Sequence, residues 1–268
     1  MTTPNVPYRM ELTVDLPGSP EQVWAAIATA NGNAAWFLPT ELEEREGGTI
    51  TVHMGEDASS SGTVTGWDPP RRLEIAEPDW AALAGHGDAE VTPLVTEYLV
   101  EAQSGGTCRL TVVSSAFGTG ADWEGEFFDG MEQGWLPYFQ NLGLYLSHFP
   151  GQTVTPLAVE QALPGSLEAV WSALKDAAGA AEVGQDIAVQ GLTGRVERLT
   201  DPPAGAEMIA LLDGPLPGML VLHVWDKGND EASANVQGYL FAEDAPAYVE
   251  REAPAWRRWL DALTVPAR

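Results

Sequence analysis

The chain has 268 residues, 44% of them hydrophobic, and its 39 acidic residues against 13 basic ones give a formal net charge of −26. This length suits one large domain or two ordinary ones, and the apolar content excludes a disordered chain. A field of this sign repels phosphate backbones and anionic lipid headgroups, so neither nucleic acid nor a membrane is expected as a partner.

Cysteine content and hydropathy indicate the cellular compartment to expect. Cys108 is the one cysteine, so no internal disulfide can form. The N-terminus has no basic region followed by an apolar run, and no stretch approaches the roughly 18–20 apolar residues of a membrane span. We therefore expect a cytoplasmic protein.

The first half of the chain begins with a predicted strand over residues 8–16 and a predicted helix from Pro20 to Ile27. Ser19 is a favourable N-cap, proline suits the first helical position, and Gln22 completes a capping box. Further strands are expected over residues 49–54, 62–67, 71–76, 91–103 and 107–115.

A long helix is predicted to close the first half, from about residue 121 to residue 147. Its apolar side chains recur at gaps of three or four, which indicates one buried stripe: Phe128, Met131, Trp135, Phe139, Leu142 and Leu146. Pro137 lies inside this helix and is expected to kink it, because its ring removes a backbone donor.

The chain contains an internal repeat. Residues 16–27 recur as residues 163–174, with eight of twelve positions identical. A second landmark follows each copy, as Asp68-Pro69-Pro70 and then Asp201-Pro202-Pro203. Two landmarks in the same order indicate two homologous domains.

The second half repeats the pattern of the first. It is predicted as a strand over 154–163, a helix over 167–178, strands over 186–190, 192–199, 206–212, 219–225 and 233–241, and a helix over 245–263. The predicted fold class is therefore α+β, with tandem domains over residues 1–150 and 151–268. Each is expected to be a curved antiparallel sheet wrapped around a long C-terminal helix.

Several short motifs of the first domain resemble a known group of proteins. They are Pro20-Glu21-Gln22-Val23-Trp24, Trp36-Phe37, Gly62-Thr63-Val64, Asp68-Pro69-Pro70-Arg71-Arg72-Leu73, Gly105-Gly106-Thr107, and Gly134-Trp135 with Leu142 and Leu146. The set resembles the START-like (SRPBCC) superfamily, in the branch of the heat-shock-ATPase activator C-terminal domain. The second domain keeps the first helix and the Asp-Pro-Pro turn but lacks the Trp-Phe and Gly-Trp pairs.

The resemblance implies a helix-grip fold with a cavity between the sheet and the long helix. Members bind lipids, hormones, polyketides or other apolar molecules. Some are polyketide aromatase/cyclases, some protect a producing organism from its toxic product, and a few regulate chaperones. Fold alone does not choose among these roles.

The two copies differ in length. Between Ile27 and Gly62 lie 34 residues, whereas 19 lie between Leu174 and Gly194, and the segment 77–88 has no counterpart in the second copy. That segment is a lid or binding loop, a longer hairpin end, or a segment that covers the interface between the domains. We therefore expect the cavity in the first domain and a largely structural second domain.

The candidate ligand-binding residues are mainly aromatic. They are Trp36, Phe37, Trp80, Tyr98, Trp123, Phe127, Met131 and Trp135. Such side chains supply large apolar and stacking surfaces for a flat ligand. The alternative is that this stripe is ordinary core, as aromatic stripes at helical spacing often are.

No catalytic, metal-binding or cofactor motif is present. The four histidines lack metal-ligand spacing, and Cys108 is expected to be a buried packing thiol. Asp122, Glu124 and Glu126 suit the dipole at the start of the long helix, unless one of them faces the cavity as an acid or base.

Three functions follow as hypotheses. The preferred one is binding of an apolar, polycyclic or polyketide-like small molecule, for sequestration, carriage or self-resistance. The second is a polyketide cyclase or aromatase, and the third is a chaperone-partner module. The oligomeric state is left open.

Overall fold

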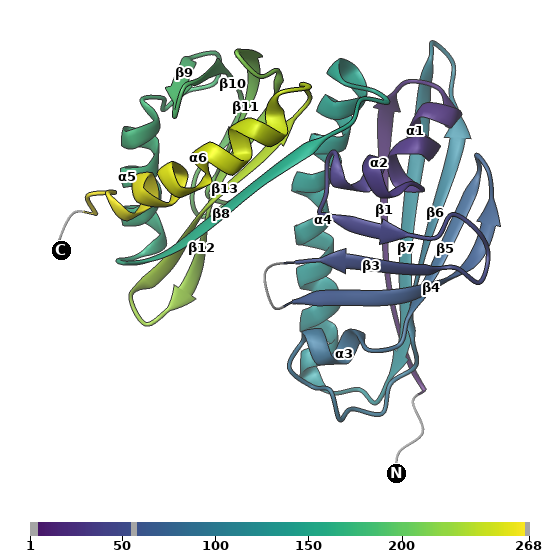
Figure 1. Cartoon of the computed structure of the whole chain (residues 1–268). Helices are drawn as coiled ribbons and strands as arrows, with labels where there is room; N and C mark the ends of the chain where they lie inside the picture. Colours follow the sequence, from purple (N-terminus) through teal and green to yellow (C-terminus); the bar gives the residue numbers. More distant parts are fainter. Residues whose placement is uncertain (1–4, 55–57, 266–268) are drawn as a thin grey trace. The chain divides into compact units, whose positions relative to one another are not determined.

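The computed structural model describes residues 5–54 and 58–265. The chain divides into two compact units, Met1–Gln152 and Thr153–Arg268 (Figure 1). In each unit one antiparallel sheet packs against helices, which confirms the predicted α+β class with two tandem helix-grip domains.

The N-terminal unit is built on a seven-stranded sheet with the strand order β1-β7-β6-β5-β4-β3-β2. Its elements are β1 (Val6–Pro17), α1 (Pro20–Ile27), α2 (Ala30–Ala34), β2 (Thr40–Leu42), β3 (Thr49–His53), β4 (Ser59–Asp68), β5 (Arg72–Glu77), α3 (Trp80–Leu83), β6 (Leu94–Ala102), β7 (Thr107–Gly118) and α4 (Asp122–His148). All neighbouring strands are antiparallel.

The C-terminal unit has a six-stranded sheet with the order β8-β13-β12-β11-β10-β9. Its elements are β8 (Thr155–Pro164), α5 (Leu167–Ala178), β9 (Asp186–Val189), β10 (Leu192–Thr200), β11 (Glu207–Gly214), β12 (Gly218–Gly228), β13 (Glu231–Leu240) and α6 (Ala245–Asp261). Buried Trp171 of α5 and Trp256 of α6 join strand residues such as Leu192 and Leu222 in one continuous core.

The repeated helix start has the expected local chemistry in both units. The backbone N–H of Gln22 donates to the Ser19 hydroxyl, and the Ser19 N–H donates back to the Gln22 side chain at 2.8 Å. In the second copy, the N–H of Ala169 donates to the Ser166 hydroxyl at 3.4 Å. These contacts satisfy donors that a helix N-terminus leaves free.

Three short elements were not predicted. They are α2, β2 and α3, with five, three and four residues, too short to show a hydrophobic period. The long helix α4 is continuous from Asp122 to His148 with Pro137 inside it. None of the helices in the described part of the chain combines the length and hydropathy that a membrane span requires.

Candidate ligand-binding cavity

A cavity of about 270 Å³ lies in the N-terminal unit, with walls from the sheet and from α4. Strands β3 to β6 form one wall, and α1 and α2 add residues at its end. The inner face follows the period of two, so buried Ile75 of β5 and buried Leu94 and Thr96 of β6 point the same way.

The helical wall uses one face of α4. Five residues of this face line the cavity, at spacings of three or four along the helix apart from the adjacent pair Gly134 and Trp135: Phe127, Met131, Gly134, Trp135 and Tyr138. A neighbouring stripe of the same helix is buried in the core, including Phe128, Phe139 and Leu142. Helix α4 therefore presents two adjoining apolar faces, one packed against protein and one lining the hollow.

Aromatic contacts fix the rings of the cavity wall. Trp135 stacks on Phe37 at a centroid distance of 5.3 Å and meets Tyr98 edge-on at 6.2 Å. Tyr138 meets Phe37 edge-on at 4.6 Å. Held in this way, the rings lose little further freedom when a ligand stacks against them.

Five of the eight candidate residues line the cavity: Phe37, Tyr98, Phe127, Met131 and Trp135. The other three, Trp36, Trp80 and Trp123, are not among its lining residues.

These three tryptophans take part in packing. Trp36 is 1% exposed, and its indole N–H donates to the carbonyl of Ala26 at 3.0 Å. Trp80 is also 1% exposed and donates to the carbonyl of Thr92 at 2.9 Å. Trp123 packs against Trp80 at 5.5 Å. Their positions reflect how α2 and α3 fold back on the sheet, which spacing alone does not show.

The opening of the cavity is marked by its exposed lining residues. Met54 is 42% exposed and Leu83, in α3, is 46% exposed, while Gly134 on α4 is also exposed. The other lining residues are buried or half-buried. The segment 77–88 thus contributes Leu83 to the rim and is anchored beside it by Trp80.

Few polar groups reach this cavity. The hydroxyls of Thr96 and Ser114 satisfy each other at 2.9 Å. Ser60 of β4 donates to the carboxyl of Glu77, the last residue of β5. Burial raises the pKa of Glu77, although the hydrogen bond from Ser60 lowers it in part. The pKa of Tyr98 is also raised, mainly by burial and to a smaller extent by the negative charge of Glu77.

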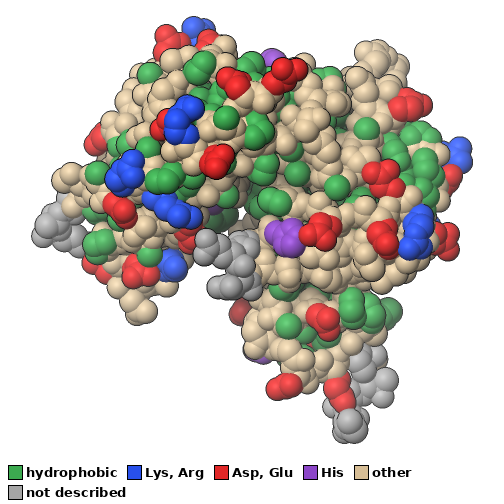
Figure 2. Space-filling view, viewed as in Figure 1, with side chains coloured by type: hydrophobic (Ala, Val, Ile, Leu, Met, Phe, Trp, Pro, Cys, Tyr) green, Lys and Arg blue, Asp and Glu red, His purple; other side chains and the backbone are tan. Residues whose placement is uncertain are grey.

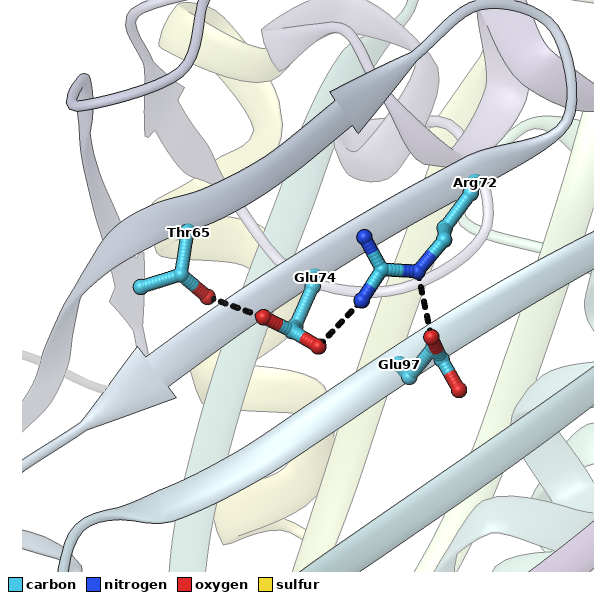
Figure 3. Close-up of polar contacts among 4 residues, drawn as sticks. All are labelled: Thr65, Arg72, Glu74 and Glu97. Atoms are coloured by element: carbon cyan, nitrogen blue, oxygen red, sulfur yellow. Dashed lines mark hydrogen bonds and ion pairs between the residues drawn. The ribbon is translucent and has the colours of Figure 1, made fainter.

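Sequence reasoning did not select Glu77 or Ser60. The signal was present, because Glu77 follows Leu73 and Ile75 at the period of two that points inward. The outer face of the same strand behaves differently. There Glu74 and Glu97 both pair with Arg72, and the hydroxyl of Thr65 donates to Glu74 at 2.8 Å (Figure 3).

The acids at the start of α4 do not line the cavity. Asp122 and Glu126 are exposed, while Glu124 is fully buried and accepts bonds from the backbone N–H groups of Thr119, Gly120 and Ala121. Burial opposes ionisation of Glu124, but these donors outweigh it and lower its pKa. Glu124 is therefore an ionised helix cap.

Cys108 is buried, and its thiol donates to the carbonyl of Gly18 at 3.2 Å. Burial raises the pKa of this thiol, as in a packing role. Within residues 5–54 and 58–265, no group of three or more His, Cys, Asp or Glu side chains could hold a metal ion.

The C-terminal unit has a groove of a different kind. A space of about 380 Å³ lies at the start of α5 and is lined by turn residues, including Pro202, Pro203 and Asn229, together with the acids Glu168, Asp226 and Asp230. Its lining mixes polar and apolar residues, among them Leu167, which packs against the hydrophobic core of that unit.

A curved antiparallel sheet closed by a long helix over an apolar hollow defines a helix-grip domain. Residues 17–147 match the family model described as "Activator of Hsp90 ATPase homolog 1-like protein". The match lies within the N-terminal unit and covers just under half of the chain.

Solved structures resemble the chain at low identity. The crystal structure of DynU16, from the dynemicin biosynthetic locus, is 15% identical, covers 94% of this chain and 96% of its own, and has a TM-score of 0.42. The di-domain ARO/CYC BexL is 13% identical, covers 97% and 99%, and has a TM-score of 0.42. The Aha1 dimer from Colwellia psychrerythraea is 15% identical over 53% of this chain and 97% of its own, with a TM-score of 0.42. The comparison with curated proteins gave no match.

Proposed function

We propose that the N-terminal unit binds an apolar, polycyclic small molecule in the cavity beneath α4. One observation carries the proposal: a hollow of about 270 Å³ is walled by fixed aromatic rings and opens to solvent at a narrow set of residues. Ligand pockets are concave and mostly apolar, with a few polar groups, and span roughly 300–1,000 Å³. This cavity is slightly smaller than that range, which suits a ligand of a few fused rings.

Binding without turnover is the favoured form of this function. Among the described lining residues, Glu77 is the one carboxyl, and histidine, cysteine and lysine are absent. An aromatase or cyclase would need further groups to move protons. Sequestration, carriage or self-resistance would each be served by binding alone. We propose a structural role for the C-terminal unit.

Native mass spectrometry of the freshly purified full chain would reveal a co-purified small molecule. In parallel, the neutral fluorescent probe N-phenyl-1-naphthylamine should bind saturably, with one site per chain. A Cβ at Gly134 would meet nothing within 4 Å, so Gly134→Trp can place an indole across the opening without a backbone clash. The matched control is Gly130→Trp, on the same helix but away from the lining.

Probe affinity should fall at least about tenfold in Gly134→Trp and change less than about twofold in the control. Equal affinity in both variants, or no saturable binding to the wild-type chain and no co-purified molecule, would contradict the proposal.

A further inference from the structure

Glu77 is the one carboxyl among the described residues that line the cavity, and apolar binding does not use its chemistry. It ends β5, and its side chain follows the inward face set by Leu73 and Ile75. Gly62, on the neighbouring strand, permits this placement, because a Cβ there would lie 3.0 Å from Cγ of Glu77. The carboxyl is thus held against β4 and turned into the hollow.

The carboxyl has one protein hydrogen bond among the described residues, from Ser60. The other titratable side chains of the described lining are Tyr98 of β6 and Tyr138 of α4; α1, α2, α3, β3 and β4 contribute none. No lysine or arginine belongs to that lining. A carboxylate in such surroundings is disfavoured until a cation reaches it.

The outer face of the sheet shows the contrast within one strand. Glu74 lies three residues before Glu77 and shares Arg72 with Glu97 (Figure 3). On the inner face, Glu77 borders the cavity, and no lysine or arginine among the described lining residues takes the part that Arg72 plays outside. A positive group supplied by a ligand would complete there the type of pair that the protein itself makes outside.

Two further features favour a cation. Trp135, Phe37 and Tyr138 bring aromatic rings to the lining of the same cavity, and aromatic rings attract organic cations. The chain carries a net charge of −26, and acidic side chains are spread over the face seen in Figure 2, with fewer basic ones between them. This field raises the local concentration of cations.

We infer that the cavity selects small apolar molecules that carry an amine, with Glu77 as the counterion of the ammonium group. This inference rests on the proposed function and narrows its ligand class.

The inference fixes the sign of a pH dependence. A protonated Glu77 that meets an ammonium ion must give up its proton to solvent, so each binding event releases up to one proton. Affinity for the amine should therefore rise with pH until Glu77 is ionised in the free protein. A neutral ligand that accepts a hydrogen bond from protonated Glu77 would show the opposite trend.

The test compares two ligands of one shape on the full chain: 2-naphthylmethylamine and 2-naphthalenemethanol. Isothermal titration calorimetry from pH 5 to pH 8, in two buffers of different ionisation enthalpy, gives affinity and proton release together. Wild-type protein should bind the amine at least about tenfold more tightly at pH 7. Glu77→Gln, which can keep the bond from Ser60, should bind both ligands alike and release no proton.

Glu101→Gln is the matched control, since it removes one negative charge from an exposed position outside the cavity. Its preference for the amine should stay within about twofold of wild type. Equal binding of amine and alcohol by wild type, or a preference that survives in Glu77→Gln, would overturn the inference while leaving apolar binding intact. Failure of both ligands and of the neutral probe would remove the proposed function as well.

Discussion

The hydrogen bonds at the start of α4 allow a test of what stabilises this helix, which forms one wall of the cavity. The carboxylate of Glu124 is fully buried, and its two oxygens accept hydrogen bonds from Thr119, Gly120 and Ala121, with the Tyr8 side chain as a further hydrogen-bond partner. One oxygen accepts from the N–H and hydroxyl of Thr119 at 2.9 and 3.0 Å, and the other from the N–H groups of Gly120 and Ala121 at 2.8 and 3.1 Å. These bonds tie the helix that forms one wall of the cavity to the end of β7.

The change Glu124→Gln keeps one acceptor oxygen and replaces the other with an amide NH₂. In its better orientation the amide turns this NH₂ toward Thr119, whose hydroxyl can accept a hydrogen bond, so that one backbone N–H, that of Thr119, faces a donor. A buried donor left without a partner costs about 1–3 kcal/mol. We therefore expect the free energy of unfolding of the N-terminal unit to fall by about 1–3 kcal/mol. Glu126→Gln, exposed on the same helix, should change it by less than about 0.5 kcal/mol.

Hydrogen-exchange mass spectrometry of the full chain reads peptides of each unit separately, so it can assign the loss to α4. Because the pKa of Glu124 is lowered in the folded state, its contribution is present above the unfolded pKa and is lost as pH falls through the folded value. The difference between wild type and Glu124→Gln should therefore shrink in acid. Equal protection of α4 in Glu124→Gln and Glu126→Gln at pH 7 would refute this reasoning.

Three further predictions concern glycines and caps. Gly134→Ala and Gly130→Ala should each stabilise α4 by about 0.8–1 kcal/mol in urea unfolding, because both sites have room for a methyl group and glycine is a poor helix former. A lower free energy of unfolding in either variant would contradict the open geometry. Ser19→Ala and Ser166→Ala should each cost about 1 kcal/mol, seen by hydrogen exchange in the unit that contains the cap. Gly194→Ala should cost at least about 2 kcal/mol of the C-terminal unit, since its Cβ would lie 2.2 Å from a backbone oxygen of β11; unchanged thermal unfolding would show that the strands can separate there.

The candidate site was only partly predictable. Phe127 and Trp123 lie one helical turn apart and both pack on Trp80, yet only Phe127 also lines the cavity. Their spacing is that of a single helix face, so periodicity assigns them together. The difference arises because α3 covers one end of α4, and a four-residue helix leaves no periodic signal.

The sequence by itself determined the duplicated α+β architecture, because a local cap chemistry and a hydrophobic period are written in consecutive residues. Ser19 and Ser166 begin matching helices, and alternation along β5 turns Glu77 inward with Leu73 and Ile75. Only the tertiary structure decided that a hollow remains beneath α4, that Trp36 and Trp80 fill space beside it, and that Glu77 reaches it without a cation. Whether a volume is filled depends on side chains that arrive from distant segments, and no local pattern encodes how closely they meet.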